Sequence, residues 1–366
     1  MEVKPLKKKT LFILLTLVLV ALPLFGSCTA PATTETIELT YSNFFPPTHL
    51  HSILAEKFCE DINERTNGRV EITYYPGGTL TPAPQTYDGV VSGISDIGMS
   101  VLAYTMGRFP ATQLIDMAHA YPNGWVATKT ANDFYKEFKP KEFDDVHVLY
   151  FHAHGPGVVF TTKKPVHKIE DLKGLVIRAT GVGAKVMEAL GAQGYGASQG
   201  EAYELMSKST LDGSFTPREV LKGWKQAEVV KYVTGCYDVG YTANMFVVMN
   251  KDKWDSMPAD VQKIFTEVSE EWIEKHGKVW TYYDKAGIDY FLSLGEGREL
   301  IELSPQEMAK WVKATQPLVA EYISEKTAMG LPAADYEEYL IERVKYWAGK
   351  TPTEDACVSW VEKELL

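Results

Sequence analysis

The sequence predicts an α/β protein of two domains, and three observations support this prediction. Short apolar runs alternate with amphipathic helical stretches, and the whole pattern occurs twice along the chain. The chain has 366 residues, which is more than one small hydrophobic core usually serves. A helical stretch over residues 258–294 is long enough, at about 1.5 Å per residue, to extend along both domains.

The start of the chain predicts an export signal over residues 1–27. Four lysines precede an uncharged apolar run from Leu11 to Phe25, which is too short to span a bilayer comfortably. The small residues that follow resemble a bacterial lipobox, so Cys28 is the expected lipidation site and the first residue of the mature protein. Cleavage by an ordinary signal peptidase stays open, because Phe25 stands where Leu is commoner in a lipobox.

Residues 28–36 are rich in Thr, Ala and Pro and show no apolar periodicity, so they predict a tether. The formal net charge of the chain is −11. Removal of the signal segment, which holds four Lys and one Glu, leaves −14. This acidity argues against nucleic acid as a partner. We expect the folded body to lie in the periplasm or on the outer face of the cytoplasmic membrane.

The first predicted domain comprises residues 37–150 together with about 245–260. Its alternating strands and helices predict a largely parallel sheet. The later segment is included because Phe246–Met249 has the pattern of a strand that returns to the first sheet. The expected elements are strands over 37–41, 70–74, 96–99 and 246–249, and helices over 50–67 and 87–91.

The second predicted domain comprises residues 151–244, followed by the long helix of 258–294. A C-terminal strand and helices over 295–366 complete the chain, with a capping box at Ser304–Glu307 and a kink at Pro317. The other expected elements are strands over 146–151, 158–162, 175–179 and near Leu211, and helices over 181–190, 201–208 and from Arg218 onward.

Arg178 is the first candidate for ligand binding. It closes an apolar strand, and the carboxyl ends of strands face the binding crevice in open α/β sheets. A guanidinium offers two parallel donors that match a carboxylate. The helix that begins at Gly181 adds free N–H groups and partial positive charge. Position alone leaves a structural salt bridge to one of the many acidic residues equally open.

Cofactor, metal and catalytic motifs find little support. Gly181 and Gly183 resemble a dinucleotide turn, but Val186 stands where the third glycine belongs. The pairs His49/His51 and His152/His154 have i, i+2 spacing, whose side chains do not share a helix face. We therefore expect a pocket hydrogen bond from His152 or His154 rather than a metal site. No cofactor, metal ligand or catalytic residue is predicted.

The remaining cysteines, Cys59, Cys236 and Cys357, have no CxxC spacing. They fit neither a disulfide framework nor a zinc site. We expect three separate buried side chains that act as small hydrophobic residues.

Several short motifs follow one another between about Tyr41 and Phe265. They are Phe45–His49, Thr66–Val70 with Tyr75–Gly78, Gly93–Gly98, Asp171–Arg178, Glu201–Tyr203 with Asp212–Gly213, and Asn250 with Trp254 and Pro258. Their order and spacing resemble the solute-binding receptors of TRAP (tripartite ATP-independent periplasmic) transporters. The resemblance implies a two-domain periplasmic-binding-protein-like fold with a hinged cleft. It also implies delivery of a small organic acid to a small and a large integral membrane subunit for ion-gradient-driven uptake.

The resemblance implies that Arg178 pairs with a ligand carboxylate. It places Gln199, Thr216, Met99, Ser100 and Phe45 along the pocket. Residue types near predicted loops and helix starts add further candidates, namely the aromatic side chains of Tyr104 and Tyr241, a hydrogen bond from His154, space at Gly157 and the helix start at Gly181.

Two departures from better-known members narrow the expected ligand. Members that bind sialic acid carry Asn where Thr216 stands, and a second Arg in the stretch that corresponds to His154–Gly157. Members that bind 2-oxo acids through a metal carry an acidic residue and Trp shortly after the Asp-Gly pair, where this chain has Ser214–Pro217. We therefore favour a monocarboxylate with an apolar or aromatic body over a sugar acid or a metal-bridged ligand.

Two other classes of function stay open. An exported enzyme that acts on a small organic acid would need an acid–base or nucleophile pair beside Arg178, and the sequence shows none. A ligand-sensing receptor for a membrane signalling protein would share the export signal, the tether and the lone arginine.

Overall fold

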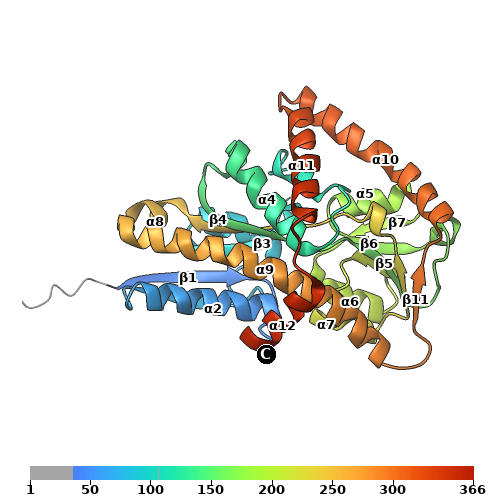
Figure 1. Ribbon diagram of the computed structural model, residues 1–366, viewed down its shortest axis with the longest axis horizontal. Helices are drawn as coiled ribbons and strands as arrows, with labels where there is room; N and C mark the ends of the chain where they lie inside the picture. Colours follow the sequence, from blue (N-terminus) through green and yellow to red (C-terminus); the bar gives the residue numbers. More distant parts are fainter. Residues whose placement is uncertain (1–35, 106) are drawn as a thin grey trace, which may run out of the picture. The chain divides into compact units, whose positions relative to one another are not determined.

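The structure is a computed structural model, and it describes residues 36–105 and 107–366. The predicted signal segment, the lipidation site Cys28 and all but the last residue of the tether lie outside the described residues. Two mixed sheets with covering helices confirm the predicted α/β class (Figure 1). No helix within the described residues is long and apolar enough to cross a membrane.

The first sheet has the strand order β2-β1-β3-β10-β4. Strand β1 runs parallel to β2 and β3, whereas β10 runs antiparallel to β3 and β4. The expected largely parallel sheet is therefore mixed, because the chain re-enters it from the second sheet in the opposite direction. The strands are β1 (Ile37–Asn43), β2 (Val70–Tyr75), β3 (Ile97–Val101), β4 (Val146–Ala153) and β10 (Asn244–Asn250).

Helices connect these strands and are capped by side chains next to them in sequence. His49 accepts a hydrogen bond from the backbone N–H of His51 at the start of α2, and Asn123 accepts one from Val126 at the start of α4. The helices are α2 (Leu50–Arg65), α3 (Thr86–Val91) and α4 (Gly124–Phe138), with 3₁₀ turns over Ala83–Gln85, Leu102–Tyr104, Thr112–Asp116 and Lys141–Phe143.

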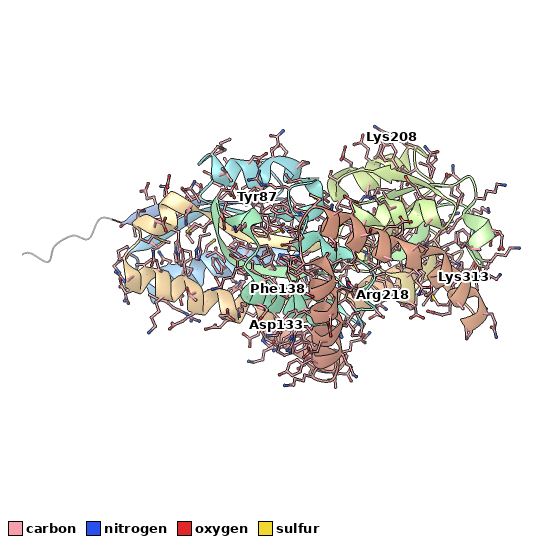
Figure 2. The ribbon with its side chains drawn as sticks, turned by 90° about the horizontal axis from the view of Figure 1, so that it is seen from above. Tyr87, Asp133, Phe138, Lys208, Arg218 and Lys313 are labelled. Atoms are coloured by element: carbon pink, nitrogen blue, oxygen red, sulfur yellow. The ribbon has the colours of Figure 1, made fainter. Side chains whose placement is uncertain are left out.

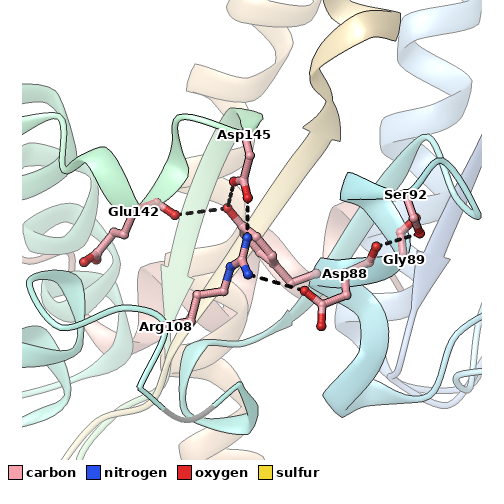
Figure 3. Close-up of polar contacts among 7 residues, drawn as sticks. Asp88, Gly89, Ser92, Arg108, Glu142 and Asp145 are labelled. Atoms are coloured by element: carbon pink, nitrogen blue, oxygen red, sulfur yellow. Dashed lines mark hydrogen bonds and ion pairs between the residues drawn. The ribbon is translucent and has the colours of Figure 1, made fainter.

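Arg108 fixes the connection that follows the Leu102–Tyr104 turn (Figure 3). Its guanidinium pairs with Asp145 and, at 3.5 Å, with Asp88, and it lies over the ring of Tyr87 at 4.3 Å. The Tyr87 hydroxyl donates to the backbone oxygen of Glu142 at 3.2 Å and to Asp145 at 2.6 Å. These contacts join Arg108 to α3 and to the residues just before β4.

The second sheet has the strand order β11-β9-β5-β8-β6-β7. Strand β5 runs antiparallel to β8 and β9, whereas the pairs β6–β7, β6–β8 and β11–β9 are parallel. The strand expected near Leu211 begins two residues later, at Gly213. The strands are β5 (Val158–Thr161), β6 (Val176–Ala179), β7 (Gln193–Gly196), β8 (Gly213–Thr216), β9 (Tyr232–Gly235) and β11 (Glu299–Glu302).

Strands β7 and β9 were not predicted, for two different reasons. β7 has the sequence Gln-Gly-Tyr-Gly and is largely exposed, so it carries no apolar alternation to detect. β9 has the sequence Tyr-Val-Thr-Gly, which holds only two apolar residues. The helices beside this sheet are α5 (Val182–Ala189), α6 (Gln199–Ser207) and α7 (Val220–Gly223), with 3₁₀ turns over Ile169–Leu172, Gln226–Glu228 and Tyr237–Val239.

The predicted long helix is α9 (Ala259–Ser293), with 35 residues, and it follows the short α8 (Lys251–Ser256). It packs against α2, α4 and β4 of the first sheet and against α7 beside the second, as Figure 1 shows. Gly287 makes the second contact possible, because a Cβ there would meet the Arg218 carbonyl oxygen at 2.1 Å. One helix therefore forms part of both cores.

The C-terminal helices pack on both halves of the fold. Helix α11 (Ala333–Ala348) crosses α4, where Phe138 meets Tyr336 and Asp133 accepts a hydrogen bond from Trp347 at 2.8 Å (Figure 2). Helix α10 (Pro305–Ala328) packs against α5 and α11, and α12 (Glu354–Glu364) packs against α9.

The predicted capping box at the start of α10 is only half formed. Ser304 accepts from the backbone N–H of Glu307, but the Glu307 carboxylate accepts from the backbone N–H of Ile169 at 2.7 Å. The Glu307 side chain therefore bonds to a residue distant in sequence and not to the backbone N–H at the start of its own helix. Pro317 lies inside α10, which continues through it.

Cys59, Cys236 and Cys357 are free and buried in the structure, as predicted.

Candidate functional site

A cavity lies between elements of the two sheets. Its wall includes the loop after β1, the end of β3, the ends of β6 and β8, and side chains of α6, α7 and α9. Most of the predicted site residues meet here. They are Phe45, Tyr104, His154, Arg178, Gln199, Thr216 and Tyr241.

The structure places the other four predicted residues outside the cavity lining, and their contact with a ligand stays a prediction. Met99 is a buried core residue of β3, and the Ser100 hydroxyl donates to the Ala83 carbonyl at 2.6 Å. The space beside Gly157 is filled by the Tyr241 ring, which a Cβ on Gly157 would meet at 2.6 Å. It therefore does not enlarge the cavity. Gly181, with φ of +52°, lies against Ala103 and borders a different hollow.

Arg178 ends up buried and without an acidic partner. Its side chain is 2% exposed on β6. Nε donates to the Ala197 carbonyl at 3.0 Å and Nη1 to Oε1 of Gln199 at 3.0 Å. No carboxylate of residues 36–105 or 107–366 forms an ion pair with it. A buried charge is costly unless it is paired, so the salt-bridge alternative finds no support within the protein.

Gln199 adds a second unused donor beside Arg178. It is the first residue of α6, and its backbone N–H donates to the Tyr104 hydroxyl at 2.9 Å. Its Oε1 accepts from Arg178 and, at 3.4 Å, from the Thr216 hydroxyl. Its Nε2 is buried and has no acceptor in the part of the chain that the structure describes. We call Arg178, Gln199 and Thr216 the arginine end of the cavity.

His154 forms part of the wall, but its ring nitrogens are already used. Nδ1 lies 2.5 Å from the Gly155 carbonyl, and Nε2 accepts from the Ala243 N–H at 2.9 Å. Nδ1 therefore carries the proton, and burial lowers the pKa of His154 to about 4. The predicted pocket hydrogen bond from His154 is not available in this arrangement, because both nitrogens serve the backbone. His152 is no substitute, since it lies outside the cavity lining.

Aromatic side chains form the apolar walls. Phe44 stacks on Phe45 with ring centroids 4.5 Å apart and on Trp224 at 6.0 Å, with interplanar angles of 25° and 19°. Nearly parallel ring planes beside a cavity suit a flat apolar group. The Tyr241 hydroxyl donates to the Phe215 carbonyl at 3.0 Å, so it is held within the wall.

Glu219 is a cavity residue that sequence reasoning missed. It lies between β8 and α7, is 2% exposed, and its Oε2 is 3.1 Å from Nε2 of His49. Burial raises the pKa of Glu219 well above its usual value and lowers that of His49 to about 3. The two residues are 170 positions apart, so no local signal links them. Glu219 and Trp224 line the cavity, whereas His49 contacts Glu219 from outside the lining.

Three histidines gather behind the cavity, in a combination that the sequence pattern did not suggest. Among the described residues, His51, His152 and His276 form the group whose nitrogens lie within 4.8 Å of one another. The rings of His152 and His276 stack in parallel at 4.2 Å, and Nδ1 of His152 accepts from Trp280 at 3.1 Å. Lone pairs in parallel ring planes do not converge on one point, so the stack fits a buried neutral core better than a metal centre.

The comparisons with known proteins now give the family. A model described as bacterial extracellular solute-binding protein, family 7, matches residues 41–326, which is well over half of the chain. The chain belongs to this family.

The relatives agree with this assignment. A monocarboxylate 2-oxoacid-binding periplasmic protein of Nostoc sp. is 26% identical over 286 residues, which are 75% of this chain and 76% of the relative. A TRAP periplasmic solute-binding protein from Desulfovibrio salexigens has 30% identity and a TM-score of 0.76, with 87% of this chain and 98% of that chain covered. One from Bordetella bronchiseptica, solved with bound (R)- and (S)-mandelate, has 28% identity and a TM-score of 0.78, with 85% and 99% covered.

The predicted resemblance to TRAP solute-binding receptors is therefore confirmed, as is the two-domain α/β fold. The protein is a transport receptor and not an enzyme, in agreement with its family. Family membership also supports the predicted location in the periplasm.

Proposed function

We propose that the protein captures a small monocarboxylate with an apolar or aromatic body, and that the arginine end of the cavity binds the carboxylate. The observation that carries this proposal is the burial of Arg178 without an acidic partner. An anion in the cavity would supply the missing counter-charge. It would also supply an acceptor for the unpartnered Nε2 of Gln199.

The rest of the cavity supports a ligand with little polarity in its middle. The cavity walls carry Phe44, Phe45 and Trp224, and the described lining offers no second arginine for a second carboxylate. The relatives from Nostoc, named for monocarboxylate 2-oxoacids, and from Bordetella, with bound mandelate, agree with this class of ligand.

The experiment begins with identification of whatever co-purifies with the protein, by mass spectrometry after denaturation. A thermal-shift series then compares aromatic and aliphatic monocarboxylates with dicarboxylates and sugar acids. Stabilisation by monocarboxylates with an apolar or aromatic body is the expected result, because bound ligand stabilises the folded state by mass action. Stabilisation by polyhydroxylated sugar acids alone contradicts the proposal.

The cavity ligand is delivered, in this proposal, to a small and a large integral membrane subunit for ion-gradient-driven uptake. The family membership supports this role. Genes for two such subunits beside the gene for this chain are the expected finding. Reconstitution of uptake with both subunits, with and without the receptor, tests it directly.

Lipid anchoring through Cys28 is part of the same proposal. It is supported by the apolar segment and the small residues that precede Cys28. The wild-type protein should sediment with membranes and release into detergent, whereas C28A should appear in the soluble periplasmic fraction. Equal fractionation of both forms would contradict anchoring at this residue.

A further inference from the structure

Tyr104 belongs to the part of the fold built on the first sheet, and it reaches the arginine end, which belongs to the second. It ends the 3₁₀ turn directly after β3, whereas Gln199 begins α6 beside the second sheet. The Tyr104 hydroxyl accepts from the backbone N–H of Gln199 at 2.9 Å, across 95 positions of the chain. The same turn approaches the second part through Ala103, because a Cβ on Gly181 would meet the Ala103 Cβ at 2.6 Å. The two parts are therefore in contact at the arginine end.

The Tyr104 hydroxyl has one hydrogen-bonding function left. A phenol hydroxyl donates one hydrogen bond and also accepts. Its oxygen accepts from the Gln199 N–H, and within residues 36–105 and 107–366 its proton has no acceptor. Tyr104 lines the same cavity as Arg178 and Gln199, so a ligand in the cavity can supply that acceptor.

The surroundings make this hydroxyl a strong donor. Burial raises the pKa of Tyr104, whereas the nearby charge of Arg178 and the Gln199 N–H act in the opposite direction. The Gln199 N–H is at the start of α6, where N–H groups lack partners within the helix and carry partial positive charge. A hydroxyl that accepts from such a group is polarised and donates more strongly.

Three functions at the arginine end are therefore unsatisfied within the described residues. Arg178 lacks a counter-charge, and both Nε2 of Gln199 and the hydroxyl proton of Tyr104 lack an acceptor. An ionised carboxylate only accepts, and its two oxygens offer about four lone pairs. It can satisfy all three functions at once. A neutral amide or hydroxyl group has no charge and offers fewer acceptor sites.

We propose that the Tyr104 hydroxyl donates a hydrogen bond to the ligand carboxylate and thereby couples carboxylate binding to the contact between the two parts of the fold. This inference rests on the proposed function, because Arg178 must hold the carboxylate beside the hydroxyl. Arg178 and Gln199 bind the carboxylate from one part, and Tyr104 binds it from the other. A ligand that contacts both parts favours the arrangement in which they touch.

Isothermal titration calorimetry on the mature protein, freed of bound ligand, gives the first test. The probes are benzoate, phenylacetate, hexanoate and pyruvate, and the one that binds most tightly is used with the variants. Y104F should bind it about 10-fold or more weakly, because a hydrogen bond to a charged group is lost.

Y121F is the matched control for the loss of a tyrosine hydroxyl. Tyr121 is buried outside the cavity lining, and its hydroxyl donates to the Ile115 carbonyl at 3.0 Å. Y121F should change the affinity by less than about 2-fold, although it removes a hydrogen bond from the fold. The melting temperature of each variant without ligand checks that it folds.

A double-mutant cycle separates a contact with the ligand from a purely structural role of Tyr104. If Tyr104 and Arg178 bind the same carboxylate, the losses in Y104F and R178K should not multiply. The double variant should then bind about 3-fold or more tightly than the product of the two losses predicts. A purely structural role of Tyr104 predicts losses that multiply.

Energy transfer between two fluorescent labels tests the coupling itself. The labels are attached at I94C, between α3 and β3, and at K208C, at the end of α6, in protein that carries C28A. Both positions are exposed, and Figure 2 labels Lys208, whereas the native cysteines of the described residues are buried. Saturating ligand should change the transfer efficiency, and Y104F should reduce this change by at least about half.

The outcomes separate this inference from the proposed function. Wild-type affinity in Y104F, or equal losses in Y104F and Y121F, overturns the inference and leaves the monocarboxylate function in place. Losses that multiply in the cycle also overturn it. A transfer efficiency that ligand does not change in the wild type, or changes equally in Y104F, overturns the coupling without any effect on the proposed function. If none of the monocarboxylates binds, both proposals fail together.

Discussion

Two arginines of the second half of the chain, one buried and one partly exposed, differ in their partners. Arg178, on β6, is 2% exposed and has no acidic residue beside it among the described residues. Arg218, just after β8, has a side chain that is 23% exposed and faces Asp284 of α9 at 3.5 Å (Figure 2 labels its position). Asp284 is almost fully buried, at 2% exposed. The long helix thus supplies a counter-charge to one arginine and none to the other.

The difference shows how the fold separates a structural cation from a ligand-binding one. Arg218 and Asp284 satisfy part of each other's charge inside the protein, so their effect should fall mainly on stability. Arg178 receives only a carbonyl and an amide oxygen, so its charge is left for a ligand. The following experiments test whether Arg178 acts mainly on ligand binding and Arg218 mainly on stability.

The largest effect is expected for the unpaired arginine. R178A should lower the affinity for a carboxylate ligand by about 2–5 kcal/mol, the loss typical when one partner of a buried charge pair is removed. R178K serves as the matched control and should recover only part of the affinity, because an ammonium lacks the two parallel donors. Calorimetric titration measures both. Unchanged affinity in R178A would show that the carboxylate binds elsewhere.

The next effect concerns the pH dependence that Asp284 brings to folding. Burial raises its pKa from 3.8 to about 6, although the charge of Arg218 lowers it. Because the folded state holds this proton more tightly than the unfolded chain, the contribution to stability is full below about pH 4 and is lost as pH rises through 6. The contribution is about 3 kcal/mol, at 1.4 kcal/mol for each pKa unit.

D284N removes this titration and is the direct test. Chemical unfolding of the wild type and D284N at several values of pH between 4 and 7 should show a stability difference that changes by up to about 3 kcal/mol across this range. A constant difference would show that Asp284 does not titrate in this window.

A smaller effect is expected for the paired arginine. R218A should destabilise the fold by about 1–3 kcal/mol at pH 8, because it leaves the buried Asp284 carboxylate without a charged donor. The loss should shrink at pH 5, where Asp284 is protonated. Ligand affinity should change far less than in R178A. A variant that loses affinity but not stability would contradict the division between the two arginines.

The smallest effect concerns the orientation of Gln199 beside Arg178. The Thr216 hydroxyl donates to Oε1 of Gln199, which leaves Nε2 of that amide free for a ligand. T216V removes this donor with little change in shape and should lower carboxylate affinity by about 0.5–1.5 kcal/mol, with stability nearly unchanged. T216S keeps the hydroxyl and should bind like the wild type. Equal losses in both variants would assign the effect to packing.

Much of the fold follows from local sequence signals. The alternation of apolar runs and helical stretches predicts both sheets, and the absence of a breaker between Pro258 and Leu294 predicts α9. Signals fail where a strand holds few apolar residues, as in β7 and β9. The direction of β10 also escapes local reasoning, because it depends on where the chain re-enters the first sheet.

The site divides in a similar way. Arg178 was predicted from its place at a strand end before a helix, and the structure brings it together with Gln199, Thr216 and the predicted aromatic residues. The Glu219–His49 pair and the stack of His51, His152 and His276 were not predicted, since their members are 170 and up to 225 positions apart. The sequence pattern grouped neighbouring histidines, whereas the fold groups distant ones.

The sequence by itself determined the α/β alternation, the long helix and the position of Arg178, and it predicted an export signal, because each depends on residues close together in the chain. The tertiary structure alone decided which buried polar groups are satisfied and which are left for a ligand. Asp284 pairs with Arg218 and not with Arg178. Both ring nitrogens of His154 form hydrogen bonds with backbone groups. Such choices depend on distances between separate elements, and only packing sets those distances.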